Sequence, residues 1–487
     1  MKRLRCTTEL IVLAVAVGAS EANSARDIPD VWWPWKRLRG AKGLERMDGG
    51  ERNLERGAAK RMQWPARLLG PRPGLREMNM LCWGLLAGLF IARFLIPMLI
   101  QLRSGTGSIV FLPADFIYFY GIGHIANNYP LERVYEYSLQ LKTFNEIYAL
   151  HDGAYGPSPY PPFVALFFSL LARVPFAAAF ALWAAISLAL YLVGIGDAVR
   201  TVFSGERLKA SPIFCFALAF YPFAVGTLAN GQLAAVAVFA TGIAIAQEAK
   251  QRMFSSGLAL SVLAYKPTLL VLVIPMLLVT RRFRALGGFA TGVAMLVLAT
   301  TAFGGIEVWA AYVRFLSLIG HVAGTAGPAG LPLWKYVDFD SCIHALSGGR
   351  GSTVLIAIGC AVVVVLADLL GKSRREGRPA QSLAWAATLT WTLLLNVYVP
   401  IYDTVLVTIS VVLTLGALKE LRRSNEAGWV VALSVAMVAA SWVTSAIAEK
   451  HGVQVLSILL AVLGVGQLYF LWRSIGASVV RVDALSG

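Results

Sequence analysis

Residues 254–280 read FSSGLALSVLAYKPTLLVLVIPMLLVT, an apolar run that holds one charged side chain, Lys266. A run of this length is long enough to cross a bilayer as a helix. A lysine inside such a helix is costly unless it faces a partner or a ligand in the protein interior, and the proline that follows it breaks the helix. The run therefore predicts a membrane segment built around one buried cation.

The rest of the chain has the composition of a membrane protein. Of its 487 residues, 57% are hydrophobic and 14% are charged, whereas a soluble domain is about half apolar and about a quarter charged. We expect an all-α polytopic membrane protein, a helical bundle with an outer loop after the first helix. About twelve segments are long enough to cross a bilayer: 80–101, 160–173, 176–196, 209–226, 231–247, 254–280, 285–303, 352–371, 383–400, 402–418, 428–447 and 453–473.

Basic residues gather in short loops, which accounts for the net charge of +16 without any nucleic-acid partner. The clearest loops are 281–284, 372–375 and 419–423. Short loops rich in Lys and Arg face the cytoplasm. We therefore expect these three loops on the cytoplasmic side, together with both termini.

Alternation from those loops places residues 102–159, residues 304–351 and the turn at Val399-Pro400 outside. It also places 197–208 and 248–253 outside, although each of these two loops carries two basic residues. That conflict with the positive-inside rule is the weak point of the predicted topology.

The first 77 residues differ from the membrane domain predicted over 78–487. Residues 1–20 have a basic start and an apolar middle, as a secretory signal does. Residues 31–78, however, are basic, rich in Gly, Pro and Arg, and run straight into the first apolar segment. We expect either a disordered cytoplasmic tail or a true translation start near Met78, favour the second, and assign the segment no catalytic role.

The five cysteines show no paired spacing. This pattern predicts neither a disulfide framework nor a Cys-x-x-Cys metal motif. No cofactor and no metal ligand are predicted, and the sequence leaves open whether a divalent metal takes part.

Asp115 lies just after the first apolar segment, in the stretch Ala114-Asp115-Phe116-Ile117-Tyr118. It is either the cap of a solvated helix or a carboxylate that works at the mouth of the bundle. A helix start would keep it ionised, as a general base for a sugar hydroxyl requires. The amphipathic stretch that follows includes Tyr118 and His124, which we expect to contact sugar, although an interfacial aromatic belt explains each aromatic equally well.

Three further polar interruptions lie in apolar segments. Tyr160-Pro161-Pro162 opens a segment, where the prolines set a rigid helix start and Tyr160 is a substrate contact. Asn230-Gly231-Gln232 is either a tight turn or a place where Gln232 meets a ligand. Tyr402-Asp403 brings a second carboxylate, which binds acceptor hydroxyls, binds a metal or pairs with Lys266.

Lys266 is the sharpest of these candidates, because its sequence neighbours include no acid. A lipid-linked phosphate would be a natural partner, since lysine binds phosphate as a point charge. A structural ion pair with Asp403 or Asp368 is the competing interpretation.

Taken in order, these residues resemble glycosyltransferase family 87, of the GT-C superfamily. Seven stretches of the chain carry the resemblance: Asp115-Phe116, Tyr160-Pro161-Pro162-Phe163, Ala181-Leu182-Trp183, Gly231-Gln232, Ala264-Tyr265-Lys266-Pro267, Phe303-Gly304-Gly305-Ile306-Glu307-Val308-Trp309 and Tyr402-Asp403. The residues after Gln232 are Leu-Ala-Ala where the family is more polar, and residues 1–77 have no family counterpart.

The resemblance implies a GT-C type bundle in a bacterial inner membrane, with the active site facing the periplasm. It implies an inverting transferase that takes a sugar, a mannose-like hexose or a pentose, from a polyprenyl-phosphate carrier to a glycan or lipid acceptor. Asp115 would be the base. We expect Lys266, Tyr160, Gln232, Tyr402, Asp403 and His124 to bind substrate.

The polar residues named above fit this chemistry even without the family resemblance. A lipid-phosphate sugar carries its own leaving group, so no nucleotide-binding fold is needed, and the apolar helices would hold the polyprenyl chain. The alternative is a transporter or flippase of lipid-linked sugars, which also needs broken helices and polar groups in the membrane. The two halves of the chain show no convincing repeat, and this favours the transferase.

Overall fold

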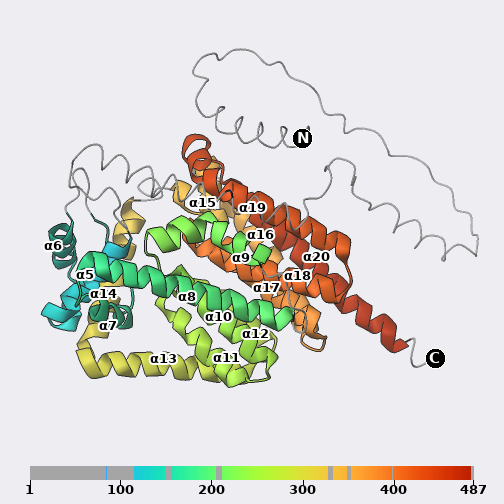
Figure 1. The fold of residues 1–487 in the computed structure, drawn as a ribbon, viewed down its shortest axis with the longest axis horizontal. Helices are drawn as coiled ribbons and strands as arrows, with labels where there is room; N and C mark the ends of the chain where they lie inside the picture. Colours follow the sequence, from blue (N-terminus) through green and yellow to red (C-terminus); the bar gives the residue numbers. More distant parts are fainter. Residues whose placement is uncertain are drawn as a thin grey trace, which may run out of the picture. The chain divides into compact units, whose positions relative to one another are not determined.

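The computed structural model describes residues 84, 115–148, 155–203, 211–326, 333–347, 352–397 and 399–483. Within these ranges the chain forms helices and no strand, apart from one isolated bridge between Tyr336 and Pro400. The all-α prediction is confirmed for this part of the chain (Figure 1). The predicted tail and nearly all of the predicted first crossing, 80–101, lie outside the described residues.

Five described helices are long and apolar enough to cross a membrane, judged by length and composition. They are α8 (Phe176–Val202), α13 (Phe283–Gly304), η8 with α18 (Ile401–Glu420), α19 (Ser424–His451) and the part Val455–Ile475 of α20 (Val455–Asp483). A sixth candidate is a pair of helices bent by 115°, η3 (Pro222–Ala229) and α10 (Ala234–Ala249). The protein is thus an integral membrane protein, and the count of about twelve crossings stays a prediction.

Helices α8, α10 and α18 (Val407–Glu420) run in the same direction, which defines two ends of the bundle. The indole Nε1 of Trp183 donates to the carbonyl of Gly231 at 2.9 Å, so α8 and α10 are side by side near their starts. At the far end of α8, a Cβ on Gly416 of α18 would collide with Val202, so α8 and α18 meet there. We call the first end the Asp115 end, since it holds Gly231 and Asp115, and the other the arginine end.

The predicted crossing 254–280 is a hairpin and not a single crossing. One leg consists of α11 (Met253–Leu260) and η4 (Ser261–Tyr265), and the other of η5 (Pro267–Leu270) and α12 (Val273–Val279). Lys266 forms the apex, where its backbone leaves the helical region with φ −143° and ψ 82°. Pro267 is the physical cause, because it cannot continue a helix that arrives from its N-terminal side.

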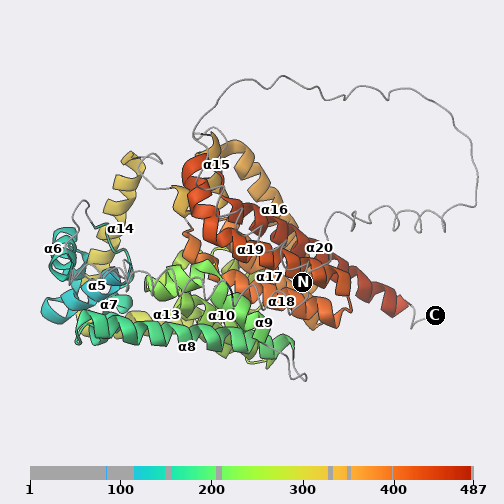
Figure 2. The same ribbon diagram turned by 45° about the horizontal axis from the view of Figure 1, so that its top comes forward.

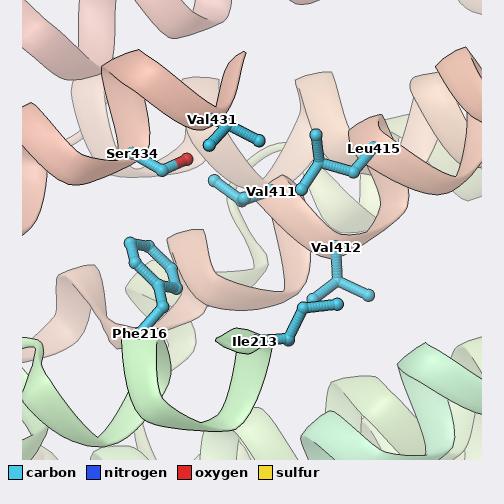
Figure 3. A pocket seen from close by; sticks show the side chains of 7 residues that line it. All are labelled: Ile213, Phe216, Val411, Val412, Leu415, Val431 and Ser434. Atoms are coloured by element: carbon cyan, nitrogen blue, oxygen red, sulfur yellow. The ribbon is translucent and has the colours of Figure 1, made fainter. Parts of the chain in front are cut away.

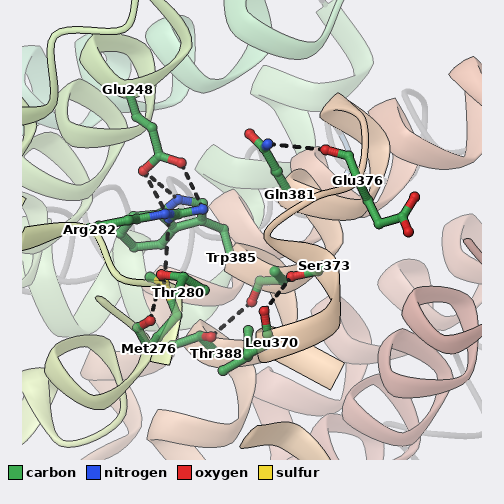
Figure 4. A network of polar contacts seen from close by, with 11 residues as sticks. Glu248, Met276, Thr280, Arg282, Leu370, Ser373, Glu376, Gln381, Trp385 and Thr388 are labelled. Atoms are coloured by element: carbon green, nitrogen blue, oxygen red, sulfur yellow. Dashed lines mark hydrogen bonds and ion pairs between the residues drawn. The ribbon is translucent and has the colours of Figure 1, made fainter. Parts of the chain in front are cut away.

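An ion pair at the base of the hairpin shows that the first leg begins, and the second leg ends, at the same end of the bundle. Arg282, just after the second leg, makes two contacts of 2.9 Å with Glu248, just before the first leg (Figure 4). The indole Nε1 of Trp385 donates to the same carboxylate at 3.1 Å. A helix that crossed the bundle once would separate these residues by its full length.

The predicted crossing 160–173 is also wrong. This region forms a short helix, α7 (Pro162–Leu171), whose two flanks touch the same turn of α5 (Phe116–Asn128). The Tyr160 ring lies 4.8 Å from that of Phe119, and the Tyr120 hydroxyl donates to the carbonyl of Val174 at 3.0 Å. Ten helical residues extend only ~15 Å, which is too short for a bilayer.

Without the crossing 160–173, residues 197–203 and 248–252 change sides of the membrane, and without the crossing 254–280 the loop 281–284 keeps its predicted side. The conflict with the positive-inside rule is thereby removed. The residues 197–203 and 248–252 now lie at the arginine end, together with the three basic loops. The Arg378 guanidinium donates to the carbonyl of Thr201 at 2.8 Å, and Lys419 Nζ lies 5.4 Å from the centre of the Phe203 ring. The prediction that the basic loops share one end is confirmed.

Small polar side chains tie the long helices together. Ser410 of α18 bonds Thr390 of α17 (Arg378–Leu394) and Gln467 of α20, each at 2.7 Å. Such bonds hold helices together in lipid, where apolar contact alone is not a driving force. One apolar void of about 20 Å³ remains between α18, α19 and α9 (Ser211–Ala219), too small for a substrate (Figure 3).

The remaining helices lie beside α5 or next to α17. Near α5, η2 (Leu131–Tyr135) and α6 (Tyr137–Ile147) join α7 and α14 (Glu307–Ala326), as Figure 2 shows. Tyr135 packs its ring against Tyr312 and Phe315 of α14, at 5.2 and 5.6 Å. The segment η7 (Leu333–Lys335) with α15 (Phe339–Ser347) leads into α16 (Ser352–Ser373).

Candidate active site

The turn Asn230-Gly231-Gln232 places Asp115 in the bundle. The backbone N–H of Phe116 donates to the carbonyl of Asn230 at 2.9 Å. Gly231 has φ +83°, and a Cβ there would collide with Phe116, so the close approach needs glycine. The turn therefore sets Gln232 beside Asp115, although 117 positions separate them in sequence.

Asp115 is not the cap of its helix. It stands at the N-cap position of α5, but its backbone is helical (φ −94°, ψ −24°) and its side chain makes no capping bond. The carboxylate is hydrogen-bonded by the Gln232 side chain instead. Burial raises the pKa of Asp115, and the Gln232 bond and the positive charge of Lys335 offset part of that rise. Sequence reasoning expected an ionised carboxylate at a helix start, whereas the structure shows one whose proton affinity is increased.

Asp338 anchors the segment that carries Lys335, the exposed lysine whose charge acts on Asp115. The buried Asp338 carboxylate accepts bonds from the backbone N–H of Ser341 at 2.8 Å and of Val399 at 2.7 Å. The backbone N–H of Val337 also donates to the carbonyl of Val399 at 2.9 Å. Burial raises the pKa of Asp338, and these bonds oppose the rise.

Lys266 forms an ion pair with Asp403, the competing interpretation of its sequence context. The Lys266 Nζ lies 2.5 Å from Oδ2 of Asp403, and their side chains are 18% and 2% exposed. The other candidate, Asp368, pairs with Lys372 at 2.6 Å. The same Nζ lies 4.9 Å from the centre of the Tyr402 ring. Lys266 thus pairs with a buried carboxylate while its own side chain stays partly exposed.

Two tyrosines join the Asp115 half of the site to the Lys266 half. The side chains of Tyr160 and Tyr402 are hydrogen-bonded to each other, and both lie within electrostatic range of Asp115 and Asp403. Close contact of the Tyr402 backbone region with Gly226 brings η8 against η3. Five of the predicted substrate-binding residues therefore gather around Asp115: Gln232, Tyr160, Tyr402, Asp403 and Lys266.

His124 lies apart from this cluster. It is nine residues beyond Asp115 on α5, about 13 Å along the helix axis, and its ring stacks on that of Tyr120 at 6.4 Å. No contact found among the described residues joins it to the cluster, so its role as a sugar contact stays a prediction.

Sequence reasoning missed Lys335 and Asp338. Both lie in the region 304–351, which the sequence marks only as a long outer loop. Their importance depends on the charge that Lys335 exerts on Asp115 and on the bond of Asp338 to Val399, and no local pattern reports such long-range interactions. Nowhere in the described ranges do three His, Cys, Asp or Glu side chains gather as metal ligands would.

The cluster can do acid–base and electrostatic chemistry. A half-buried carboxylate with a raised pKa can accept a proton, and a partly exposed lysine can stabilise a developing phosphate charge. Aromatic rings and hydroxyls between the two groups suit a sugar, whose faces are apolar and whose edges are polar.

Comparison with known proteins identifies the family of the chain. Residues 159–400 match the family model of glycosyltransferase family 87. No curated protein and no solved structure matches the chain. The matched range contains Tyr160, Gln232 and Lys266, while Asp115 lies before it and Asp403 after it. The chain belongs to glycosyltransferase family 87, and it is a membrane glycosyltransferase of GT-C type.

Proposed function

We propose that the protein is an inverting transferase that takes a sugar, a mannose-like hexose or a pentose, from a polyprenyl-phosphate carrier. The acceptor is a glycan or a glycolipid, and the reaction takes place at the Asp115 end, on the non-cytoplasmic side of a bacterial inner membrane. The basic loops at the opposite end support this orientation, because such loops face the cytoplasm.

The observation that carries the proposal is the environment of Asp115. The carboxylate is half-buried, is hydrogen-bonded by Gln232 and is not used to cap its helix. In the reaction the acceptor hydroxyl gives its proton to Asp115 as its oxygen attacks the anomeric carbon. The bond from that carbon to the phosphate oxygen breaks, and its electron pair leaves with the polyprenyl phosphate.

Lys266 is the proposed contact for the leaving phosphate. Its ammonium group holds Asp403 with one side, and its remaining N–H donors are available to phosphate oxygens. Asp403 then orients the lysine and keeps it charged in the low-dielectric interior. Lys335 adds a second positive charge near Asp115, which favours an anionic donor.

The two tyrosines are the proposed sugar contacts. Tyr160 and Tyr402 both lie within electrostatic range of Asp115 and Asp403, and their side chains are hydrogen-bonded to each other. A sugar that replaces this bond would have the acceptor and Asp115 on one side and the phosphate and Lys266 on the other. Inversion requires this arrangement, because the nucleophile enters opposite the leaving group.

The test is carrier-dependent transfer by the purified protein. Polyprenyl-phosphate sugars are offered as a panel, and both transfer and hydrolysis of the donor are measured. Asp115→Asn is nearly isosteric and should reduce the rate by about 10²–10⁴ while the protein stays folded. Full turnover by this variant would remove Asp115 from the mechanism.

A flippase of lipid-linked sugars is the alternative function, and the broken hairpin with Lys266 at its apex is compatible with it. Donor movement across vesicles without any release of polyprenyl phosphate would favour the flippase. If the wild-type protein releases polyprenyl phosphate and the Asp115→Asn variant does not, the transferase is favoured.

A further inference from the structure

A pocket lined by charged side chains lies at the arginine end, away from the proposed active site. Its volume is about 550 Å³, and α12, α16, the loop after α16, and α20 surround it. Four basic residues line it: Arg281, Lys372, Arg374 and Arg375. Val279 and Ile475 give it an apolar wall. The cavity therefore has a cationic side and an apolar side.

The basic side chains of the cavity exceed its acidic ones. Asp368 and Glu376 also line it, and Asp368 is paired with Lys372 at 2.6 Å. Among the ion pairs of the described residues, none involves Arg281, Arg374 or Arg375. Three guanidinium groups therefore line the pocket together with one further carboxylate, that of Glu376, and guanidinium groups match phosphate oxygens in geometry.

The backbone holds Arg281 in a fixed position at the cavity. Its φ is +55°, and its N–H donates to the carbonyl of Leu278 at 3.0 Å. The next residue, Arg282, is anchored by its N–H on the carbonyl of Leu277 at 2.8 Å and by its side chain on Glu248. A positive φ is uncommon for a residue other than glycine, so the surrounding contacts must hold Arg281 in this conformation.

We propose that this cavity binds the phosphate of an anionic phospholipid, with its acyl chains along Val279 and Ile475. Basic pockets between helices at the cytoplasmic face of membrane proteins bind such headgroups. Basic loops obey the positive-inside rule without binding any particular lipid. Here a pocket of about 550 Å³, open to its surroundings, and adjoining apolar side chains accompany the charge, and a lipid needs both.

The proposal stands apart from the proposed function, because the cavity and Asp115 lie at opposite ends of the bundle. Loss of lipid binding would leave the transfer reaction chemically intact, and loss of transfer in Asp115→Asn would leave lipid binding intact. The two ideas can therefore fail separately.

The experiment measures binding of short-chain phosphatidylglycerol to the detergent-purified full chain by native mass spectrometry and calorimetry. Short-chain phosphatidylcholine and free glycerol phosphate are the comparison ligands. Arg374→Gln with Arg375→Gln removes two charges and should weaken phosphatidylglycerol binding about 10- to 30-fold. Lys250→Gln with Arg252→Gln removes the same charge at the same end but outside the cavity, and should leave binding unchanged.

Each outcome decides the proposal. Selective binding of phosphatidylglycerol that only the cavity variant loses would support it. Equal binding of phosphatidylcholine, or equal losses in both double variants, would show general attraction to basic loops and overturn it. Glycerol phosphate that binds as tightly as the lipid would show a free-phosphate site and overturn the assignment to lipid. A melting curve for each variant shows that it is folded.

Discussion

Gln232 tunes the proposed base, and this can be tested through pH dependence. Its bond favours the charged carboxylate, so Gln232→Met should raise the pKa of Asp115 further. A base works only when deprotonated, so activity falls as pH falls through this pKa. We expect the acid limb of kcat/KM to lie above the usual range of an aspartate and to move to still higher pH in the variant. Gln381→Met, at the arginine end, should leave the limb in place, and an unmoved limb in Gln232→Met would contradict the assignment.

Also at the residue scale, substitutions in the Lys266–Asp403 pair can distinguish a structural role of Lys266 from a role in binding the donor phosphate. Removal of one partner leaves a buried charge alone and should cost roughly 3–5 kcal/mol. Lys266→Met with Asp403→Asn should therefore recover stability over either single variant. If Lys266 also binds the phosphate, the double variant stays weak in donor binding, while Lys266→Arg keeps part of it. Melting temperature and donor affinity of the four proteins check this, and full donor binding in the double variant would refute the phosphate contact.

At the scale of elements, the hairpin 253–279 depends on the clamp at its feet. Arg282 and Glu248 are 10% and 7% exposed, so Glu248→Gln should leave Arg282 nearly unpaired and cost roughly 3–5 kcal/mol. Asp197→Asn breaks the exposed pair of Asp197 with Arg200, which should cost about 0–1 kcal/mol. Thermal unfolding of both variants in detergent checks the contrast. Equal, small losses would show that the clamp does not hold the hairpin.

At the scale of the whole molecule, the corrected topology makes a prediction that the sequence-based one does not. In a protein with its native cysteines replaced by serine, Ser138→Cys should be labelled from outside. Lys250→Cys should be labelled only after permeabilisation, together with Arg374→Cys, because both lie at the arginine end. Labelling of Lys250→Cys from outside would restore the single crossing at 254–280.

The sequence by itself determined the class of the molecule and most members of the candidate site. Apolar segments, the basic loops and the buried cation at Lys266 are local signals, because each rests on the cost of placing particular side chains in lipid. Gln232, Tyr160 and Asp403 were found in the same way, as polar groups inside apolar segments. All three lie with Asp115 in the structure.

Only the tertiary structure decided how those segments run and which charges meet. An apolar run with Pro267 in the middle has the same composition whether it crosses once or turns back, and only the Glu248–Arg282 contact distinguishes the two. The bond from Gln232 to Asp115, the choice of Asp403 over Asp368 and the approach of Lys335 join residues that are far apart in sequence. The energies of such contacts depend on packing and burial, which no local pattern of residues contains.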